Sequence, residues 1–445
     1  MASRGLMSLV LLFAMVVDAS AYTFDEVVVG YWAGSGSNKA VVVIDFGVDS
    51  FTFGYRWEGG TKYGKDLMDA VAAAGPLDYT KTGGFLNTIS YGSYSDIGQG
   101  GWPTDWWSYF ISGDGENWAD PGESFATMVL TNGSWDGWAH QTTGDWPPVH
   151  LPTTPVASDF ASKIISYRGP FGSRPYDDPN SVLGKPTTFI KQSATKVFAC
   201  SLVYPAWNTA PDGGKLIVTL NIGAEIIPGF DHKVADDPGN PFGIDFIVFG
   251  NSGFVSTGWV EPNTNMDKFF LENPTSVFSE PVTVSVAQDP NGPWYTFTNG
   301  PFADGIFPTN AFVWDSNRGD WGEESNWLKP VDSNLRISNF NGLSAANAIK
   351  LYDGSAGGTG FDLKWLDPND YQALAIDPDT GQRWIKYIKV TSDEFGEVDG
   401  FADVAACGDY KHPYPVGDIN KDCRVDMIDF AEVAAHWLEC TWNCK

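Results

Sequence analysis

Basic residues are scarce in this chain of 445 residues. It holds 27 Lys and Arg residues against 55 Asp and Glu residues, a formal net charge of −28 at pH 7. Nucleic acids and anionic membrane surfaces attract basic patches, so this charge argues against both as partners. The same acidity fits a calcium-rich extracellular setting, or simply a soluble surface.

Cysteine is rare over most of the sequence. Cys200 is the one cysteine before residue 407, and its apolar surroundings in the sequence predict a buried, inert thiol. No Cys-x-x-Cys is present, so a zinc site is not expected. The other cysteines predict two disulfides with three connectivities open. They are Cys407, Cys423, Cys440 and Cys444.

Long apolar runs are confined to the start of the chain. Arg4, the apolar stretch 6–17 and the small residues 19–21 have the order of a secretory signal, placed at 1–21. An uncleaved anchor is the alternative, although the stretch is short for a bilayer. The sequence therefore predicts a secreted protein, extracellular or at the cell surface, with no membrane span in the mature chain.

Recognisable catalytic motifs are also missing. The chain has neither a Gly-x-Ser-x-Gly elbow nor a His-Glu-x-x-His zinc helix, and its 5 histidines are far apart in sequence. We therefore predict a protein that is not an enzyme. A glycoside hydrolase needs only two carboxylates at a fixed separation, and the 55 acidic residues leave that alternative open.

A calcium-loop pattern is present near the C-terminus, in segment 418–429. Ca²⁺ takes six to eight oxygens, so alternate residues of a tight loop must point inward. The segment has this spacing, and an amphipathic helix follows it. An Asp/Asn-rich turn before a helix is the alternative. The predicted Ca²⁺ ligands are Asp418, Asn420, Asp422, Arg424 through its carbonyl, Asp426 and Asp429.

The segment 417–430, Gly-Asp-Ile-Asn-Lys-Asp-Cys-Arg-Val-Asp-Met-Ile-Asp-Phe, resembles one repeat of a type I dockerin. Dockerins are calcium modules that attach secreted bacterial proteins to cohesin partners, and they carry two such repeats. Cys423 stands where the loop usually has glycine. The resemblance implies a short helical calcium-loop module at 407–445, with a cohesin-like or other cell-surface protein as its partner.

A small, aromatic-rich α+β domain with a β-grasp-like arrangement is expected at 22–150. Segments 39–46 and 50–57 predict a strand pair around the turn Gly47-Val-Asp, and an apolar stripe over 67–74 predicts a helix. Aromatic strands follow. Prolines then mark a stiff linker, placed at 151–161.

Three motifs in this first unit carry a resemblance to the domain at the C-terminus of transcobalamin and in bacterial surface proteins. They are Gly64-Lys-Asp-Leu-Met68, Trp106-Trp-Ser-Tyr109 and Gly133-Ser-Trp-Asp-Gly-Trp138. The resemblance covers most of 38–140 and implies either cobalamin capture or an accessory role.

A second, larger unit is expected at 162–406, and with it a mainly β protein. Its short apolar runs, separated by turns, predict an antiparallel β-sandwich or jelly roll. One run, 244–249, should lie mid-sheet, with Ile244, Phe246 and Val248 on one face and Asp245 near one end. The runs are 216–221, 244–249, 282–287 and 384–390.

Three stretches of the second unit resemble a bacterial cell-surface β-sandwich family. They are Gly243–Asn251, Ser279–Asp289 and Gly360–Leu363. The family is non-catalytic, with members in corrinoid-uptake and in polysaccharide-use systems. The resemblance covers most of 180–406.

Two further sets of residues are candidate sites. Asp245, Asn251 and Asp362 could hold a second metal ion at the rim of the sandwich, although acids in an acidic protein also occupy turns. Exposed tryptophans are platforms for flat ligands, although core packing is the alternative for each ring. The predicted ligand-binding rings are Trp102, Trp106, Trp107 and Trp118.

Taken together, these patterns predict a secreted, non-catalytic, glycan-associated binding protein with a calcium-dependent attachment module. Corrinoid capture at the cell surface and a cryptic glycoside hydrolase of a polysaccharide-degrading assembly are the alternatives.

Overall fold

The computed structural model describes residues 27–404 with gaps at 83, 194, 208–214 and 379, together with residues 24, 417, 419, 430, 431, 433 and 434. The chain is mainly β, as predicted. It divides into two compact units between Val156 and Ala157, inside the segment interpreted as a linker. The predicted signal segment, the six predicted calcium ligands and the four C-terminal cysteines lie outside the described residues.

The first unit is built on a mixed six-stranded sheet. In pairing order its strands are β1 (Val29–Gly34), β3 (Ser50–Trp57), β2 (Asn38–Asp45), β11 (Ser134–Gln141), β8 (Trp106–Ser112) and β9 (Trp118–Ala119). The predicted strand pair is present as β2 and β3, which run antiparallel. β1 is parallel to β3, and β11 is parallel to β2.

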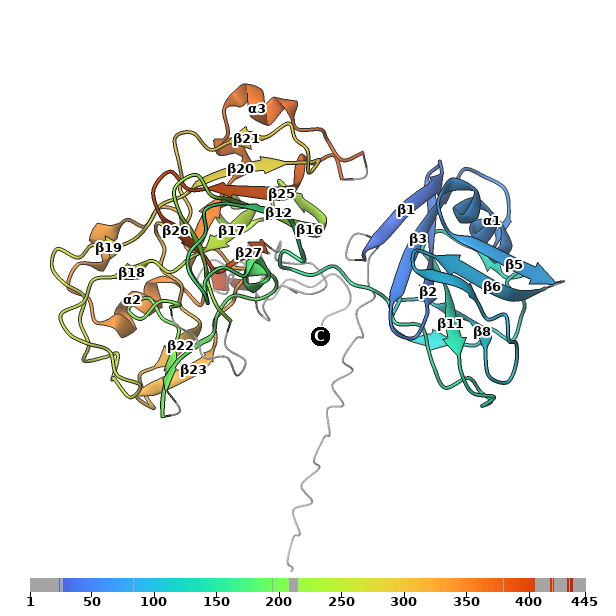
Figure 1. Ribbon diagram of the computed structural model, residues 1–445, viewed down its shortest axis with the longest axis horizontal. Coiled ribbons are helices and arrows are strands. Elements are labelled where there is room, and N and C mark those ends of the chain that lie inside the picture. The colour runs from blue at the N-terminus through green and yellow to red at the C-terminus, as the bar shows by residue number, and fades with distance from the viewer. Residues whose placement is uncertain are drawn as a thin grey trace, which may run out of the picture. The chain divides into compact units, whose positions relative to one another are not determined.

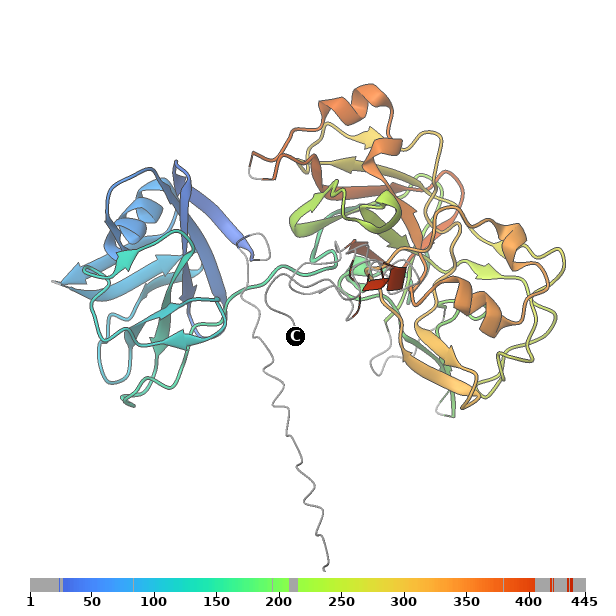
Figure 2. The same ribbon diagram turned by 180° about the vertical axis from the view of Figure 1, so that it is seen from behind.

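The predicted helix is α1 (Gly64–Ala74), which lies against one face of this sheet (Figures 1 and 2). Leu67 and Val71 lie one turn apart and are fully buried, as an amphipathic helix requires. The helix ends before Gly75. A Cβ there would lie 2.2 Å from the Tyr31 ring, so only glycine allows this contact.

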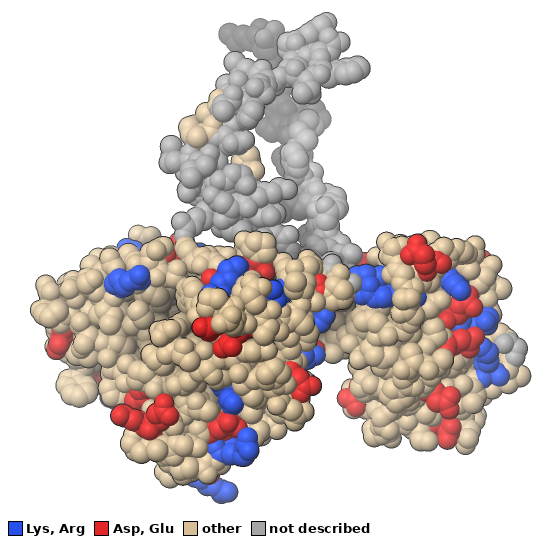
Figure 3. Space-filling view, turned by 90° about the horizontal axis from the view of Figure 1, so that it is seen from above, with Lys and Arg blue, Asp and Glu red and all other residues tan. Residues whose placement is uncertain are grey.

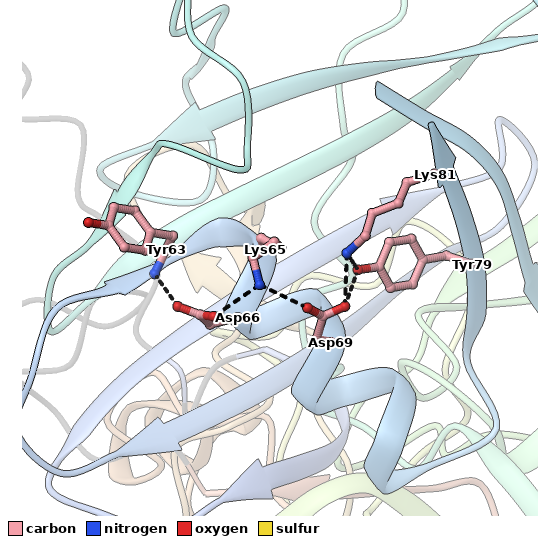
Figure 4. A network of polar contacts seen from close by, with 6 residues as sticks. All are labelled: Tyr63, Lys65, Asp66, Asp69, Tyr79 and Lys81. Carbon is pink, nitrogen blue, oxygen red and sulfur yellow. Dashed lines mark hydrogen bonds and ion pairs between the residues drawn. The ribbon is translucent and has the colours of Figure 1, made fainter. Parts of the chain in front are cut away.

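A second sheet packs beside the helix, and its strands are β5 (Asp78–Thr82), β6 (Phe85–Tyr91) and β7 (Tyr94–Ile97). β4 (Lys62–Tyr63) and β10 (Val129–Leu130) form a short antiparallel pair. Figure 4 shows the polar network that joins α1 to β5. The Asp69 carboxylate accepts hydrogen bonds from Tyr79 Oη at 2.6 Å and Lys81 Nζ at 3.1 Å.

The second unit has two main antiparallel sheets. The larger one contains, in pairing order, β12 (Lys163–Arg168), β16 (Glu225–Ala235), β25 (Trp384–Thr391), β20 (Thr283–Ala287) and β21 (Tyr295–Thr296). The smaller one contains β24 (Thr359–Phe361), β17 (Phe246–Phe249) and β27 (Gly400–Asp403). Both sheets contribute to one buried core, with Val284 and Ile388 from the first and Phe246 and Phe401 from the second.

Strand β17 lies between two antiparallel neighbours and is buried on both faces, as predicted for this run. Phe246 and Val248 face the core shared by the two sheets, whereas Ile247 and Phe249 face a second cluster. The prediction for Ile244 is wrong. It packs with Ile247 because it ends a 3₁₀ turn before the strand, where strand alternation does not yet apply.

Short elements complete the second unit. Four antiparallel strand pairs are β13 (Phe189–Ser193) with β14 (Lys196–Ala199), β15 (Val218–Leu220) with β26 (Gly396–Val398), β18 (Gly253–Phe254) with β19 (Val277–Phe278), and β22 (Phe312–Asp315) with β23 (Asp320–Glu324). The helices are α2 (Ala345–Leu351) and α3 (Pro368–Ala373). Cys200 is buried and free, as predicted.

Over the described part of the chain, no helix is long and apolar enough to cross a membrane. On the face shown in Figure 3, acidic and basic side chains are interspersed over both units, and most of the visible surface carries neither.

Candidate functional site

A pocket of about 640 Å³ opens in the second unit, between three segments that are distant in the sequence. Segment 203–207 follows β14, segment 251–260 follows β17, and Phe278 ends β19. Its lining residues are Val203, Tyr204, Pro205, Trp207, Asn251, Phe254, Val255, Ser256, Thr257, Gly258, Trp259, Val260 and Phe278.

Three aromatic side chains around this pocket are exposed to solvent. Trp259 is 95% exposed, Phe278 58% and Trp207 40%. Single exposed apolar side chains are common on proteins and need no explanation, but several at one concave site mark a binding surface. The pocket therefore combines a concave shape with rigid rings that can each cover a large contact area.

The floor of the pocket is held in place by packing. Phe254 is buried in β18, and its ring centroid lies 4.6 Å from that of Phe340. Tyr204 stacks on Phe198 with centroids 4.1 Å apart, in nearly parallel planes. Since both rings are fixed by neighbours outside the pocket, the concave surface exists before any ligand arrives.

Polar groups lie among the aromatic rings. Ser256 and Thr257 line the pocket, and Thr257 Oγ1 donates to the Phe270 carbonyl at 3.1 Å. Asn251 also lines it, and this side chain is only 7% exposed. Such groups can orient a hydroxylated ligand over an apolar platform.

Asn251 connects the pocket to a group of three carboxylates. Glu280, Asp304 and Glu397 each place a carboxylate oxygen within 4.8 Å of the other two. Asn251 is hydrogen-bonded to Glu397, whose carboxyl is hydrogen-bonded in turn to that of Glu280. The main-chain N–H of Ser252 donates to Asp304 at 2.7 Å. We call Glu280, Asp304 and Glu397 the glutamate triad.

The glutamate triad resists ionisation. Burial raises the pKa of Glu397 to about 7, and the hydrogen bond and charge of Glu280 add to that shift. Burial also raises the pKa of Asp304 well above its usual range, although hydrogen bonds from main-chain N–H groups favour its charged form. Carboxyl groups this close together share a proton or a cation.

A second group of three carboxylates contains two of the predicted metal residues. Asp245 and Asp362 lie within 4.8 Å of one another and of Asp236, and all three are buried. We call this group the aspartate triad. Burial raises the pKa of Asp245 to about 8. Lys364 Nζ forms an ion pair with Asp236, so this group has a cation supplied by the protein.

The predicted set of Asp245, Asn251 and Asp362 is wrong for Asn251. Asp245 precedes β17 and Asn251 follows it, and six residues of extended chain span about 20 Å. One ion cannot reach both ends. Asn251 is hydrogen-bonded to Glu397 of the glutamate triad instead.

The four predicted tryptophans do not form one surface. Trp102 is 66% exposed, whereas Trp107 is 6% exposed and packs in the main core of the first unit, so assigning it to a ligand is wrong. Trp118 packs in a separate cluster, and Trp106 donates its indole N–H to the Thr143 carbonyl at 2.8 Å. Adjacent residues of a strand point to opposite faces, which separates Trp106 from Trp107.

No protein-family model matches this chain, and no curated protein matches it. The residues of the pocket that sequence reasoning missed, Trp207, Trp259 and Phe278, come from segments joined only by the fold. No local pattern in the sequence marks them as neighbours.

Proposed function

We propose that the protein is a secreted, non-catalytic binding protein whose second unit binds a glycan in the aromatic pocket. The observation that carries this proposal is the group of three exposed rings, Trp207, Trp259 and Phe278, around one pocket of about 640 Å³. This volume falls in the range of about 300–1,000 Å³ typical of small-molecule sites.

Sugar rings suit such a surface for a physical reason. A pyranose has an apolar C–H face, which gains contact with a flat aromatic ring, and hydroxyl groups at its rim, which need hydrogen bonds. Trp259 offers the first contact, while Ser256 and Thr257 can offer the second. An acidic protein surface does not oppose this binding, because neutral sugars carry no charge.

The finer layout belongs to the same proposal. The two main sheets of the second unit would form a β-sandwich that carries the pocket, and the α+β first unit would be an accessory domain. The segment 407–445 would bind Ca²⁺ and attach the protein to a cohesin-like partner outside the cell, as its dockerin-like sequence implies.

Hydrolysis at the glutamate triad is disfavoured by the geometry of its two glutamates. Retaining glycosidases hold their two carboxyl groups about 5–5.5 Å apart, with the sugar between them, and inverting enzymes hold them farther apart. Glu280 and Glu397 are hydrogen-bonded to one another. This contact leaves no space for a glycosidic bond between these two groups.

The test is a binding screen of the full mature chain against glycans and corrinoids, followed by calorimetry with the best ligand. Trp259→Ala and Trp207→Ala should each weaken binding by about 1–2 kcal/mol, as the loss of an aromatic anchor does. Trp365→Ala is the matched control, because Trp365 is 42% exposed in the same unit but does not line the pocket.

Trp102→Ala tests the site that the sequence predicts in the first unit. If this change weakens binding and the two pocket changes do not, the first unit holds the ligand and our assignment fails. A screen that finds corrinoid binding and no glycan binding would move the function to the alternative that the sequence left open.

A further inference from the structure

We propose that the glutamate triad and Asn251 form a Ca²⁺ site directly behind the aromatic pocket. This site is separate from the loop at 418–429 and from the predicted set at Asp245. It does not depend on the pocket's ligand being a glycan, because its occupancy can be measured without any ligand.

Three carboxylates converge here from three parts of the fold, and the Asn251 amide lies beside them. Glu397 lies in β26, Glu280 precedes β20, Asp304 lies in the loop after β21, and Asn251 follows β17. Oxygens on opposite sides of a Ca²⁺ ion stand about 4.6–5.2 Å apart, since each lies about 2.3–2.6 Å from the ion. The carboxylate oxygens already lie within 4.8 Å of one another, so a Ca²⁺ ion fits with little movement.

The negative charge of the glutamate triad favours a bound cation. Three carboxylates are gathered here, and among the described residues none of the recorded ion pairs involves Glu280, Asp304 or Glu397. Buried carboxylates are stable when they are paired or when they coordinate a metal. The aspartate triad satisfies this rule through Lys364, and the glutamate triad has no such partner in this part of the chain.

The Asn251 side chain supplies a further oxygen beside the glutamate triad. Its side chain is 7% exposed, and its amide oxygen is buried without a hydrogen-bond partner. The amide lies against Glu397, to which it is hydrogen-bonded. A buried amide oxygen without a partner costs about 1–3 kcal/mol. Since oxygen and nitrogen of an amide exchange places by rotation of the group, the oxygen can turn to an ion held by the triad.

The ligand types select calcium. All four groups are oxygen donors, whereas zinc and copper sites use histidine or cysteine. Mg²⁺ requires near-ideal octahedral geometry with shorter bonds and keeps several waters, which a site built from four protein oxygens does not favour. Glu280 and Glu397 are half-buried, so an ion can enter from the side on which they lie.

The site also has a direct connection to the pocket. Asn251 lines the pocket and Phe278 lies two residues before Glu280. An ion that binds Asn251 and Glu280 would therefore hold two parts of the pocket wall in position. Calcium should then raise ligand affinity, by ordering the wall before binding.

The experiment uses the full chain carrying Asp418→Ala, which removes a predicted ligand of the C-terminal loop. Calorimetric titration with CaCl₂, up to a few millimolar because extracellular calcium modules bind with Kd of about 10⁻⁴–10⁻³ M, should still show one site. Glu397→Gln and Asp304→Asn in this background should each weaken that site at least about tenfold. Asp362→Asn, in the aspartate triad, is the matched control and should leave it unchanged.

Circular dichroism of each variant without calcium establishes that it is folded, and Glu280→Gln, at a half-buried position, provides a milder third variant. The proposal is overturned if the Asp418→Ala chain takes up no calcium, or if its site survives Glu397→Gln and Asp304→Asn. It is also overturned if the site is lost on Asp362→Asn alone. None of these outcomes depends on whether a glycan binds, so failure here is distinguishable from failure of the proposed function.

Discussion

The two carboxylate triads of the second unit differ in how their charge is balanced. In the aspartate triad, Lys364 pairs with Asp236, and Tyr371 Oη donates to Asp236 at 2.5 Å. In the glutamate triad, the recorded partners of the carboxyl groups are neutral donors and one another. The triads are otherwise alike, because each has a buried asparagine beside it with an amide oxygen that lacks a partner, Asn240 in one and Asn251 in the other.

This difference distinguishes the aspartate triad, whose charge is balanced within the chain, from the glutamate triad, which we propose binds an ion. The cation of the aspartate triad is part of the chain, so this group is complete when the protein folds. The glutamate triad can be completed by a proton or by an ion from solution, and its neighbour Asn251 lines the pocket. Buried polar groups without a permanent partner are thus most informative where they adjoin a cavity.

The largest expected effect concerns a third group of acids, which a histidine neutralises. Protonated His232 donates from Nδ1 to Asp231 and from Nε2 to Asp403, each at 2.8 Å. Burial lowers the pKa of His232, but the two carboxylates outweigh it and raise the pKa to about 9. His232→Gln should therefore cost about 3 kcal/mol at pH 7, because two partly buried carboxylates lose the charge of His232.

The sign of this effect can be checked by pH. The raised pKa stabilises the fold fully below pH 6.5, and the stabilisation is lost as pH rises through about 9. Urea unfolding of wild type and His232→Gln should differ most at pH 6–7 and little at pH 10. An equal difference at both pH values would show that packing, not charge, is what the histidine supplies.

Lys364→Met should have the next largest effect, about 2 kcal/mol in urea unfolding. It leaves Asp236 buried without its cation, but the lysine side chain is 53% exposed, so water can replace part of the interaction. Lys329→Met is the matched control. Its partner Asp353 is 69% exposed, and loss of a surface pair costs less than about 1 kcal/mol. Equal losses in the two variants would remove the distinction between the triads.

Much of the fold behind these groups was predictable from the sequence. The apolar run of β2, the alternating aromatic residues of β3 and the apolar stripe of α1 are sequence signals that packing did not override. Asp245 and Asp362 were foreseeable as neighbours because β17 and β24 pair with Phe246 opposite Phe361, which places the adjacent aspartates opposite each other. The proximity of Asp236 to these two residues was not predictable, because Asp236 follows β16, which belongs to the other main sheet.

The ligand surface was not predictable, for a different reason. A dense group of tryptophans shows that rings are available, but strand alternation decides which ones are buried, as Trp107 illustrates. The pocket gathers Trp207 and Trp259 from separate loops. Their proximity depends on tertiary packing, which leaves no periodic pattern in the sequence.

Glu397→Gln should affect stability in opposite directions with and without calcium. In a chelator at pH 8, it should leave stability unchanged or raise it by up to about 1 kcal/mol, because one of three crowded carboxyl groups can no longer ionise. In calcium the variant should be less stable than wild type, because an ion ligand is lost. Asp236→Asn should be destabilising in both buffers, since Lys364 then loses its partner. If calcium changed the stability of the two variants in the same way, the proposed difference between the two triads would be contradicted.

The smallest effect is expected at the exposed network of the first unit (Figure 4). Asp69 is 47% exposed, although it contacts Lys65, Lys81 and Tyr79. Exposed ion pairs contribute little because water screens them. Asp69→Asn should lower the free energy of unfolding by less than about 1 kcal/mol, and 0.5 M NaCl should reduce even this difference. A loss of stability comparable to that of Lys364→Met would mean that burial does not determine how much an ion pair contributes to the free energy of unfolding.

The most direct test of the difference between the triads is a crystal structure of the full chain grown in calcium. We predict one ion with ligand distances of about 2.3–2.6 Å among Glu280, Asp304, Glu397 and Asn251, and no ion among Asp236, Asp245 and Asp362. An ion in the aspartate triad, with none in the glutamate triad, would contradict the account.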